Sequence, residues 1–156
     1  EWRTMYRALS ESEIKDVLQA QAVGHLGCYA DNRMYVVPTA YYYEDYNVYA
    51  FAVEGQKIAM MRNNPEVCIQ VENVEETGTW QSVIVWGTFH EVSDDDRPDV
   101  IAKLSAHLYG QHLEGKLVYA PFRSKETMLD ACMKEKDMIV YRIEMHDWTG
   151  RREEVR

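Results

Sequence analysis

The first pattern of hydrophobic and polar positions predicts an amphipathic helix over residues 10–21. Ser10 and Glu13 have the spacing of a capping box, and Leu9 can pack over the first turn against Ile14. The hydrophobic residues that follow share one face of the predicted helix: Ile14, Val17 and Leu18. We therefore expect this helix to lie against the rest of the fold.

The next two segments predict a β-hairpin. Residues 22–30 form a strand candidate that contains two glycines, where a bend or a close backbone approach is expected. Asp31 and Asn32 are typical turn residues, and they lead into a second strand candidate over residues 34–43.

The strand Tyr35–Tyr43 is apolar or aromatic at both alternating sets of positions, which predicts that both of its faces are covered. One face would line a barrel interior, and a ligand or another subunit would cover the other. Pro38 cannot donate a hydrogen bond, so we expect the pairing to be interrupted at mid-strand and to leave backbone groups free for a planar ligand. The alternative is an edge strand that its proline protects from further pairing.

Residues 48–53 predict a strand that feeds a short helix, which opens at Gly55 and stops at Pro65. The first turn of a helix presents unpaired N–H groups, and the peptide dipoles there disfavour a cation such as Lys57. A bound anion would remove this conflict, which makes the turn a candidate phosphate site. The alternative is a solvated lysine at a helix start.

Residues 67–72 predict a short strand, and residues 80–92 predict a long one that is apolar at both sets of positions. A strand of this length suits a small, strongly coiled barrel, with Gly87 permitting the bend. The acidic run 94–96 predicts charge at the start of a helix that continues through Leu108, rather than a metal site.

The C-terminal part predicts connecting structure, a helix, a strand and a polar tail, over residues 113–123, 124–136, 138–145 and 148–156 respectively. We find no internal repeat and no linker. The sequence therefore predicts one mainly β domain over 1–156, a β-barrel flanked by helices, with its core at about 22–147.

The composition limits the classes of partner that the protein is expected to bind. The chain has 156 residues and a formal net charge of −9, which argues against a nucleic-acid partner. No apolar run is long enough to span a membrane, and the first residues do not have the pattern of a signal peptide. The three cysteines, Cys28, Cys68 and Cys132, are far apart and predict reduced thiols in a cytoplasmic protein.

No catalytic residue can be assigned from spacing. The five histidines do not form a metal-ligand set, because His107 and His112 are five residues apart on a predicted helix. No serine lies in a nucleophile elbow, and no cysteine lies beside a histidine in a nucleophile motif. If the protein is an enzyme, we expect it to rely on a bound cofactor, which strengthens the phosphate-site interpretation.

The order of these segments resembles the FMN-binding split-barrel superfamily. The stretches that carry the resemblance are GHLGCY, YVVPTAYYY, VYAFAVEGQKIAMMRNNPEVC and WQSVIVWG. Within the superfamily the chain is similar to the pyridoxamine-5′-phosphate-oxidase-like proteins, and most similar to the branch grouped with nitroimidazole-resistance flavoproteins. The resemblance covers residues 23–92 well and extends more weakly to Gly150.

The resemblance implies a homodimer of six-stranded antiparallel Greek-key barrels with two FMN molecules between the subunits. By the same resemblance, backbone groups of one subunit would line the flavin ring, a helix start would hold the 5′-phosphate, and residues of the partner would approach the flavin. The ring residues are Val37, Pro38 and Thr39, followed by Phe51 and Ala52 on the next strand. The phosphate residues are Gln56 and Lys57, with Arg62 as a second cation. The approaching residues are Trp80, Gln81 and Ser82, with Ser82 as the hydrogen-bonding one.

Three departures from the family pattern affect the expected chemistry. The nitroimidazole-resistance branch typically carries histidine at the position of Phe51. Pyridoxamine-phosphate oxidases carry an Arg-x-His signature that residues 146–151 do not reproduce, and Arg-Lys where this chain has Gln56 and Lys57. The missing histidine argues against the particular chemistry of the nitroimidazole-resistance branch, and the other two departures argue against vitamin B6 oxidation.

The leading hypothesis is an FMN-dependent oxidoreductase that passes electrons from a reduced nicotinamide donor to a small organic acceptor. The second is a non-catalytic barrel dimer that binds flavin or haem, although the candidate haem ligands His107 and His112 lie outside the groove motifs. A purely structural dimer would leave Lys57 and Pro38 unexplained.

Overall fold

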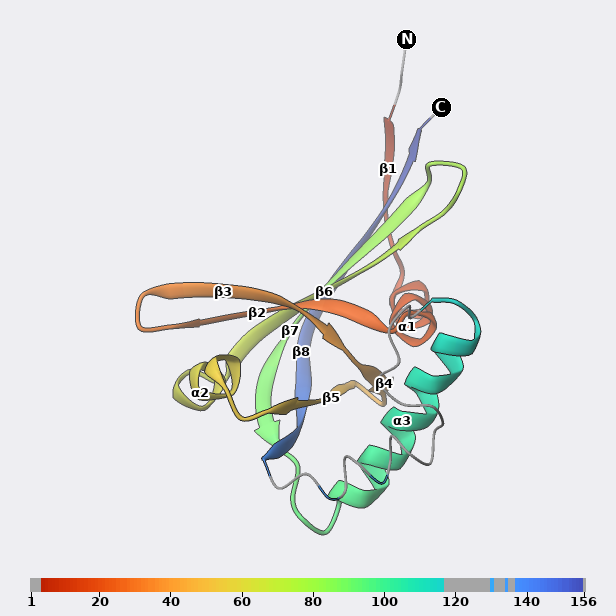
Figure 1. Cartoon of the computed structure of the whole chain (residues 1–156). Helices are drawn as coiled ribbons and strands as arrows, with labels where there is room; N and C mark the ends of the chain where they lie inside the picture. Colours follow the sequence, from red (N-terminus) through yellow and green to blue (C-terminus); the bar gives the residue numbers. More distant parts are fainter. Residues whose placement is uncertain (1–3, 117–129, 131–133, 135–136, 156) are drawn as a thin grey trace.

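The computed structural model describes residues 4–116, 130, 134 and 137–155. In this part of the chain, strands dominate, and helices flank them (Figure 1). The strands are β1 (Thr4–Ala8), β2 (Val23–Ala30), β3 (Arg33–Ala40), β4 (Tyr42–Glu44), β5 (Asn47–Val53), β6 (Glu66–Val74), β7 (Trp80–Glu91) and β8 (Met138–Val155). The helices within residues 4–116 are α1 (Glu11–Ala20), α2 (Gln56–Asn63) and α3 (Arg97–Leu113).

The sheet closes into a barrel. Its strand order is β3-β2-β6-β7-β8-β5-β4, and every pairing along it is antiparallel. Only Tyr41 separates β3 from β4, so the two ends of the order are one strand that changes partner at Tyr41. Counted this way, the barrel has six strands. Because β5 and β6 follow one another in the chain without being neighbours, the topology is a Greek key and the prediction of a six-stranded antiparallel barrel is confirmed.

Tyr41 fixes the corner where the strand changes partner. Its side chain is fully buried, its hydroxyl donates to the Leu18 carbonyl at 2.7 Å, and its N–H donates to the Ala22 carbonyl at 2.9 Å. These bonds connect the corner to the end of α1 and the chain that follows. Burial also raises the pKa of the Tyr41 phenol well above its ordinary value.

The barrel interior is filled by side chains from alternating positions of every strand, as expected for a small closed sheet. Its largest fully buried members include Tyr41, Tyr141, Leu26, Ile69, Val71, Val48 and Ile143. The inner side of α1 adds Ile14, Val17 and Leu18.

The predicted N-terminal helix and the first hairpin are confirmed. Ser10 caps α1, and its side chain accepts from the Glu13 N–H at 3.2 Å in a complete capping box. Asp31 and Asn32 take positive φ values of 52° and 59° between β2 and β3, which is the conformation of a tight hairpin turn. A Cβ on Gly24 would lie 2.9 Å from the Ile69 side chain, so the expected close approach is present.

The bend in the long strand is also confirmed. The register between β7 and β8 shifts between Trp86 and Gly87, which marks a bulge. A Cβ on Gly87 would lie 2.3 Å from the Glu144 carbonyl oxygen, so only glycine fits at this position.

Pro38 does not interrupt the pairing, so that prediction is wrong. The register of β3 with β2 continues through Pro38, which lies opposite His25, and the break falls at Tyr41 instead. In the described chain β3 pairs with β2 only, so Pro38 lies on an edge strand, as the alternative interpretation had it.

The predicted polar tail over 148–156 is wrong as well. β8 runs on to Val155, and β1 pairs with its last residues, from Ala8 opposite Arg151 to Thr4 opposite Val155. Together with the β6–β7 hairpin, these strands project from the barrel as an arm (Figure 1). We call this part, formed by residues 4–8, 72–82 and 151–155, the arm.

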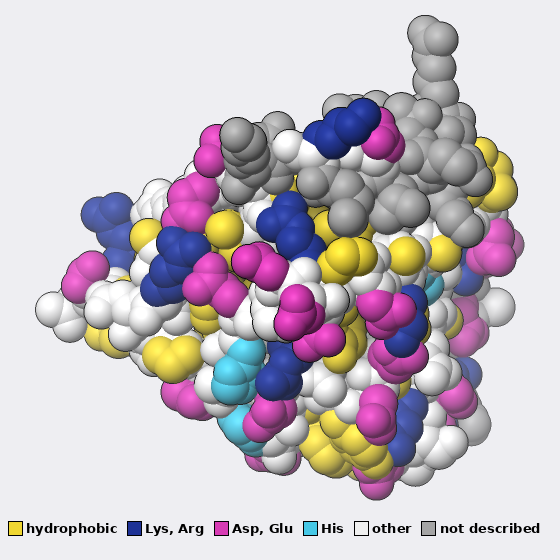
Figure 2. All heavy atoms as spheres, turned by 90° about the horizontal axis from the view of Figure 1, so that it is seen from below, with side chains coloured by type: hydrophobic (Ala, Val, Ile, Leu, Met, Phe, Trp, Pro, Cys, Tyr) yellow, Lys and Arg dark blue, Asp and Glu magenta, His cyan; other side chains and the backbone are white. Residues whose placement is uncertain are grey.

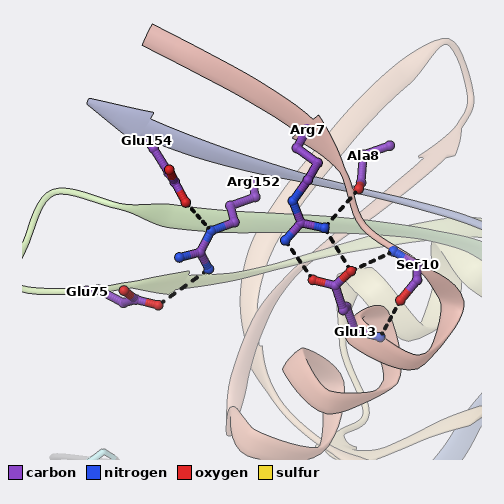
Figure 3. A network of polar contacts seen from close by, with 7 residues as sticks. All are labelled: Arg7, Ala8, Ser10, Glu13, Glu75, Arg152 and Glu154. Carbon is purple, nitrogen blue, oxygen red and sulfur yellow. Dashed lines mark hydrogen bonds and ion pairs between the residues drawn. The ribbon is translucent and has the colours of Figure 1, made fainter. Parts of the chain in front are cut away.

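Ion pairs hold the arm to α1 and to itself (Figure 3). Arg7 donates two hydrogen bonds of 2.9 Å to the Glu13 carboxylate. These bonds and the Ser10 backbone lower the pKa of Glu13 to about 2. Arg152 donates to Glu154 at 2.8 Å and lies 3.7 Å from Glu75.

The predicted helix over residues 124–136 lies almost wholly outside the described residues, as does Cys132. Within the described part, Cys28 and Cys68 are free thiols, Cys28 buried and Cys68 half-buried. No described helix is long and apolar enough to cross a membrane.

Candidate functional site

The start of α2 lies where β5 leaves the barrel. Gly55 is the N-cap residue, but its backbone is extended (φ −174°), so the conformational freedom of glycine is not needed there. No side chain caps the helix, and its first turn contains no acidic residue. The first N–H groups of α2 are therefore left for solvent or a ligand.

Lys57 occupies this turn in an unusual state. Its side chain is half-buried, and burial lowers the pKa of its ammonium, an effect that a negative charge on Cys28 would partly oppose. Within the described residues, no hydrogen bond or ion pair holds the ammonium. A partly desolvated cation without an acidic partner is a suitable contact for an anionic ligand group.

Arg62, the predicted second cation, is engaged elsewhere. Its guanidinium pairs with Glu54 beyond the end of β5 and with Glu91 at the end of β7. Both carboxylates raise the pKa of Arg62 above its ordinary value. Arg62 therefore connects α2 to the ends of β5 and β7, and its guanidinium is not part of the proposed site. Gln56 is exposed one residue before Lys57.

The three predicted ring contacts on β3 alternate in direction. Val37 and Thr39 point into the barrel, whereas Pro38 is exposed on the outside. Thr39 is only 5% exposed, and its hydroxyl lies near that of Tyr141, whose pKa is raised by burial. The edge of β3 that faces away from β2 carries no strand in the described chain, so its backbone groups are open to a ligand.

Phe51 and Ala52 point to opposite sides of β5. Ala52 is buried in the barrel core. The Phe51 ring is half-buried on the outside, where it packs on the hydrophobic clusters that α3 forms against the barrel, with Leu104 and Ile101 among their members. The side chain of Phe51 is thus occupied by helix packing.

Trp80, Gln81 and Ser82 lie on the arm. Ser82 Oγ accepts from Gln70 Nε2 at 3.1 Å, which leaves the Ser82 hydroxyl hydrogen available as a donor. Gln81 faces the other side, where it accepts from Asn73 Nδ2 at 3.1 Å. Trp80 and Ser82 line a pocket on the arm, whereas Gln56 lines a separate pocket beside α2, so these two parts of the predicted site face different pockets within one chain.

The candidate haem ligand His107 also has a local role. Its Nε2 lies 3.1 Å from the Gln21 carbonyl oxygen, and its ring packs on Tyr42 with the centroids 5.6 Å apart. These contacts fix α3 against β4 and the chain that follows α1.

One side of the sheet is left uncovered by the described helices. We call it the outer face, formed by the outward side chains of β3, β2, β6, β7, β8 and β1. Most of the strongly exposed hydrophobic side chains lie on it: Tyr6, Val23, Tyr29, Met34, Val36, Val74 and Trp86. The outward residues Trp80, Ser82 and Pro38 belong to the same face. Exposed hydrophobic side chains that gather on one face are common at interaction surfaces.

These features define the class of protein: a Greek-key split barrel with a lysine at the start of the helix that joins its third and fourth strands, β5 and β6, and with exposed hydrophobic side chains on its outer face. The chain belongs to the pyridoxamine 5′-phosphate oxidase family, whose model matches residues 10–152. The expected superfamily and fold are thereby confirmed.

Known structures and relatives agree with this assignment. An FAD-binding protein from Mesorhizobium loti is 32% identical, with 95% of this chain and 98% of that chain covered and a TM-score of 0.73. A putative 5-nitroimidazole antibiotic resistance protein from Bacteroides thetaiotaomicron shares the fold at 16% identity, with coverages of 99% and 93% and a TM-score of 0.73. An uncharacterised protein from Rhizobium meliloti is 35% identical over 86 residues, which are 55% of this chain and 57% of that relative's length.

Proposed function

We propose that the protein is a flavoprotein that binds FMN as a homodimer, with the 5′-phosphate at the start of α2. The observation that carries the proposal is Lys57, a half-buried cation without an anionic partner in the described chain. The uncapped N–H groups of the same turn add donors for a phosphate. The similar protein from Mesorhizobium loti binds FAD, which has the same ring system and also carries phosphate.

The proposed flavin ring lies between two copies of the chain. The free edge of β3, at Val37–Thr39, offers backbone groups in one subunit. Trp80 and Ser82 lie on the outer face, away from Lys57 of their own chain, so they would come from the partner. The exposed Met34 and Val36 on the outer face support a subunit contact there, because water would otherwise cover them.

The proposed activity is oxidoreduction between a reduced nicotinamide donor and a small organic acceptor. A bound flavin supplies the two-electron chemistry, for which the described site shows no acid, base or nucleophile of its own. The chain's part is to hold the phosphate with Lys57, to orient the ring edge with β3, and to exclude water with Trp80. Vitamin B6 oxidation is not proposed, because the Arg-x-His signature is absent and residues 146–151 form part of β8.

Anaerobic addition of NADH or NADPH to the flavin-loaded protein tests the proposed activity. We expect the flavin absorbance to bleach and to recover when a quinone or nitroaromatic acceptor is added. A flavin that stays oxidised with both donors would contradict an oxidoreductase and favour a non-catalytic flavin-binding dimer.

Placing a glutamate on the outer face tests the proposed subunit contact. Met34, on the outer face, is 82% exposed, and Val53, at the end of β5, is 59% exposed. Met34→Glu should shift the protein to a monomer in analytical ultracentrifugation and release flavin, because a carboxylate would have to be buried in the contact. Val53→Glu, the matched control, should remain dimeric. A dimer that tolerates Met34→Glu as well as Val53→Glu would refute this contact.

A further inference from the structure

A pocket on the arm combines two residues of the proposed flavin contact, Trp80 and Ser82, with residues that the proposed flavin site does not use. It has a volume of about 500 Å³ and lies between β1, β7 and β8 on the outer face. Its walls include two aromatic rings and an aliphatic side chain, those of Tyr6, Trp80 and Ile84. Ser82 and Arg151 add polar groups. We call it the arm pocket.

The arm pocket differs in charge from the rest of the molecule. The chain has a net charge of −9, and acidic side chains are spread over the face shown in Figure 2. The described lining of the arm pocket nevertheless includes Arg7 and Arg151 and no acidic residue. The Arg7 guanidinium donates two hydrogen bonds to Glu13 and one to the Ala8 carbonyl. Among the described residues, the Arg151 guanidinium donates only one, to Glu153, so it keeps more donors for a ligand.

Arg151 is held in place before any ligand arrives. Its Nη2 donates to Glu153 at 2.7 Å, and the Glu153 side chain is only 10% exposed. Its guanidinium carbon lies 4.8 Å from the centre of the Tyr6 ring, in a cation–π contact. The Arg151 side chain is still 60% exposed, so the remaining N–H donors of the guanidinium can reach a ligand.

We propose that the arm pocket binds a small planar aromatic anion, with its ring against Tyr6 and Trp80 and its carboxylate on Arg151. Aromatic walls favour a flat ring, and a guanidinium with free donors favours a carboxylate. The Ser82 hydroxyl can donate to a second polar substituent. The pocket shares Trp80 and Ser82 with the proposed flavin contact. A ligand held there would lie beside the proposed flavin and would be its electron acceptor. This role rests on the proposed function, whereas the binding itself does not.

Equilibrium dialysis with two matched probes tests the pocket. The probes are 4-nitrobenzoate and its neutral counterpart 4-nitrobenzamide, each with the flavin-loaded and the flavin-free protein. We expect the anion to bind about tenfold more tightly, the value of one hydrogen bond to a charged group. Arg151→Gln should abolish this preference, and Arg151→Lys should retain part of it.

The control is Arg33→Gln, which removes an exposed arginine at the start of β3 and should keep the full preference. Flavin content should be the same in all variants. Equal binding of the two probes to the unmodified protein, no binding of either, or a preference that survives Arg151→Gln would overturn the proposal. A protein that takes up no flavin contradicts the proposed function alone, since the flavin-free dialysis still reports on the pocket.

Discussion

Replacing Lys57 with methionine separates the binding of the phosphate from the binding of the flavin ring. Methionine keeps most of the length and the apolar stem of lysine and removes only the charge. Because burial lowers the pKa of the Lys57 ammonium, the free protein bears a cost for holding this charge. We therefore expect Lys57→Met to unfold at a temperature no lower than the unmodified protein.

The magnitude follows from one charge-assisted hydrogen bond, which contributes about 1.5–3 kcal/mol. Lys57 is only half-buried, so solvent screening places the effect near the lower value, or about tenfold in dissociation constant. Fluorescence titration should show this loss for FMN and FAD, which carry phosphate, and no change for riboflavin, which does not. Arg62→Gln is the control on the same helix, since Arg62 pairs with Glu54 and Glu91.

The affinity for FMN should decrease as the pH rises. The pKa of Lys57 is lowered in the flavin-free protein, and a bound phosphate would raise it again. FMN affinity should therefore fall in the alkaline range, starting below the ordinary lysine pKa, and the riboflavin titration corrects for ionisation of the ring. An equal loss of FMN and riboflavin affinity in Lys57→Met, or no loss of either, would refute the phosphate contact.

Three further predictions concern the framework that positions the site. Glu13→Gln should speed hydrogen exchange of the β1 amides, because it breaks the bidentate ion pair with Arg7. In the unmodified protein, the ion pair should protect these amides fully above the ordinary carboxyl pKa. The protection should be lost as the pH falls towards the lowered pKa of Glu13, about 2. Gly87→Ala should lower the free energy of unfolding in urea by about 2 kcal/mol, because its Cβ would meet the Glu144 carbonyl, and an unchanged midpoint would contradict the bulge. Tyr41→Phe should cost about 1 kcal/mol in the same titration, and a stabilised variant would show that its buried hydrogen bond is not needed.

The parts of the fold that sequence could predict are those with a local physical cause. The capping box at Ser10 and the turn at Asp31 each depend on residues a few positions apart. The bend at Gly87 depends on glycine itself, which is uncommon inside a long apolar strand and therefore stands out in the sequence. The end of β8 had no such signal. Its residues 151–154 are two arginines followed by two glutamates, so they lack the apolar alternation of a half-buried strand.

The same limit applies to the candidate site. Spacing placed Lys57 in the first turn of a helix, but no local pattern could show that Glu91, on a distant strand, would pair with Arg62. Nor could it show that Tyr6, from a segment without a predicted element, would stack on Arg151. Both contacts depend on strand pairings between residues far apart in the sequence.

The central claim is that this barrel holds a flavin between two chains, and the visible spectrum of the purified protein tests it most directly. The protein should be yellow as purified, or become so on incubation with FMN and gel filtration, with one flavin per chain in a dimer-sized peak. Mass spectrometry of the ligand released on denaturation should identify FMN. A colourless protein that retains neither FMN nor FAD after gel filtration would contradict the account.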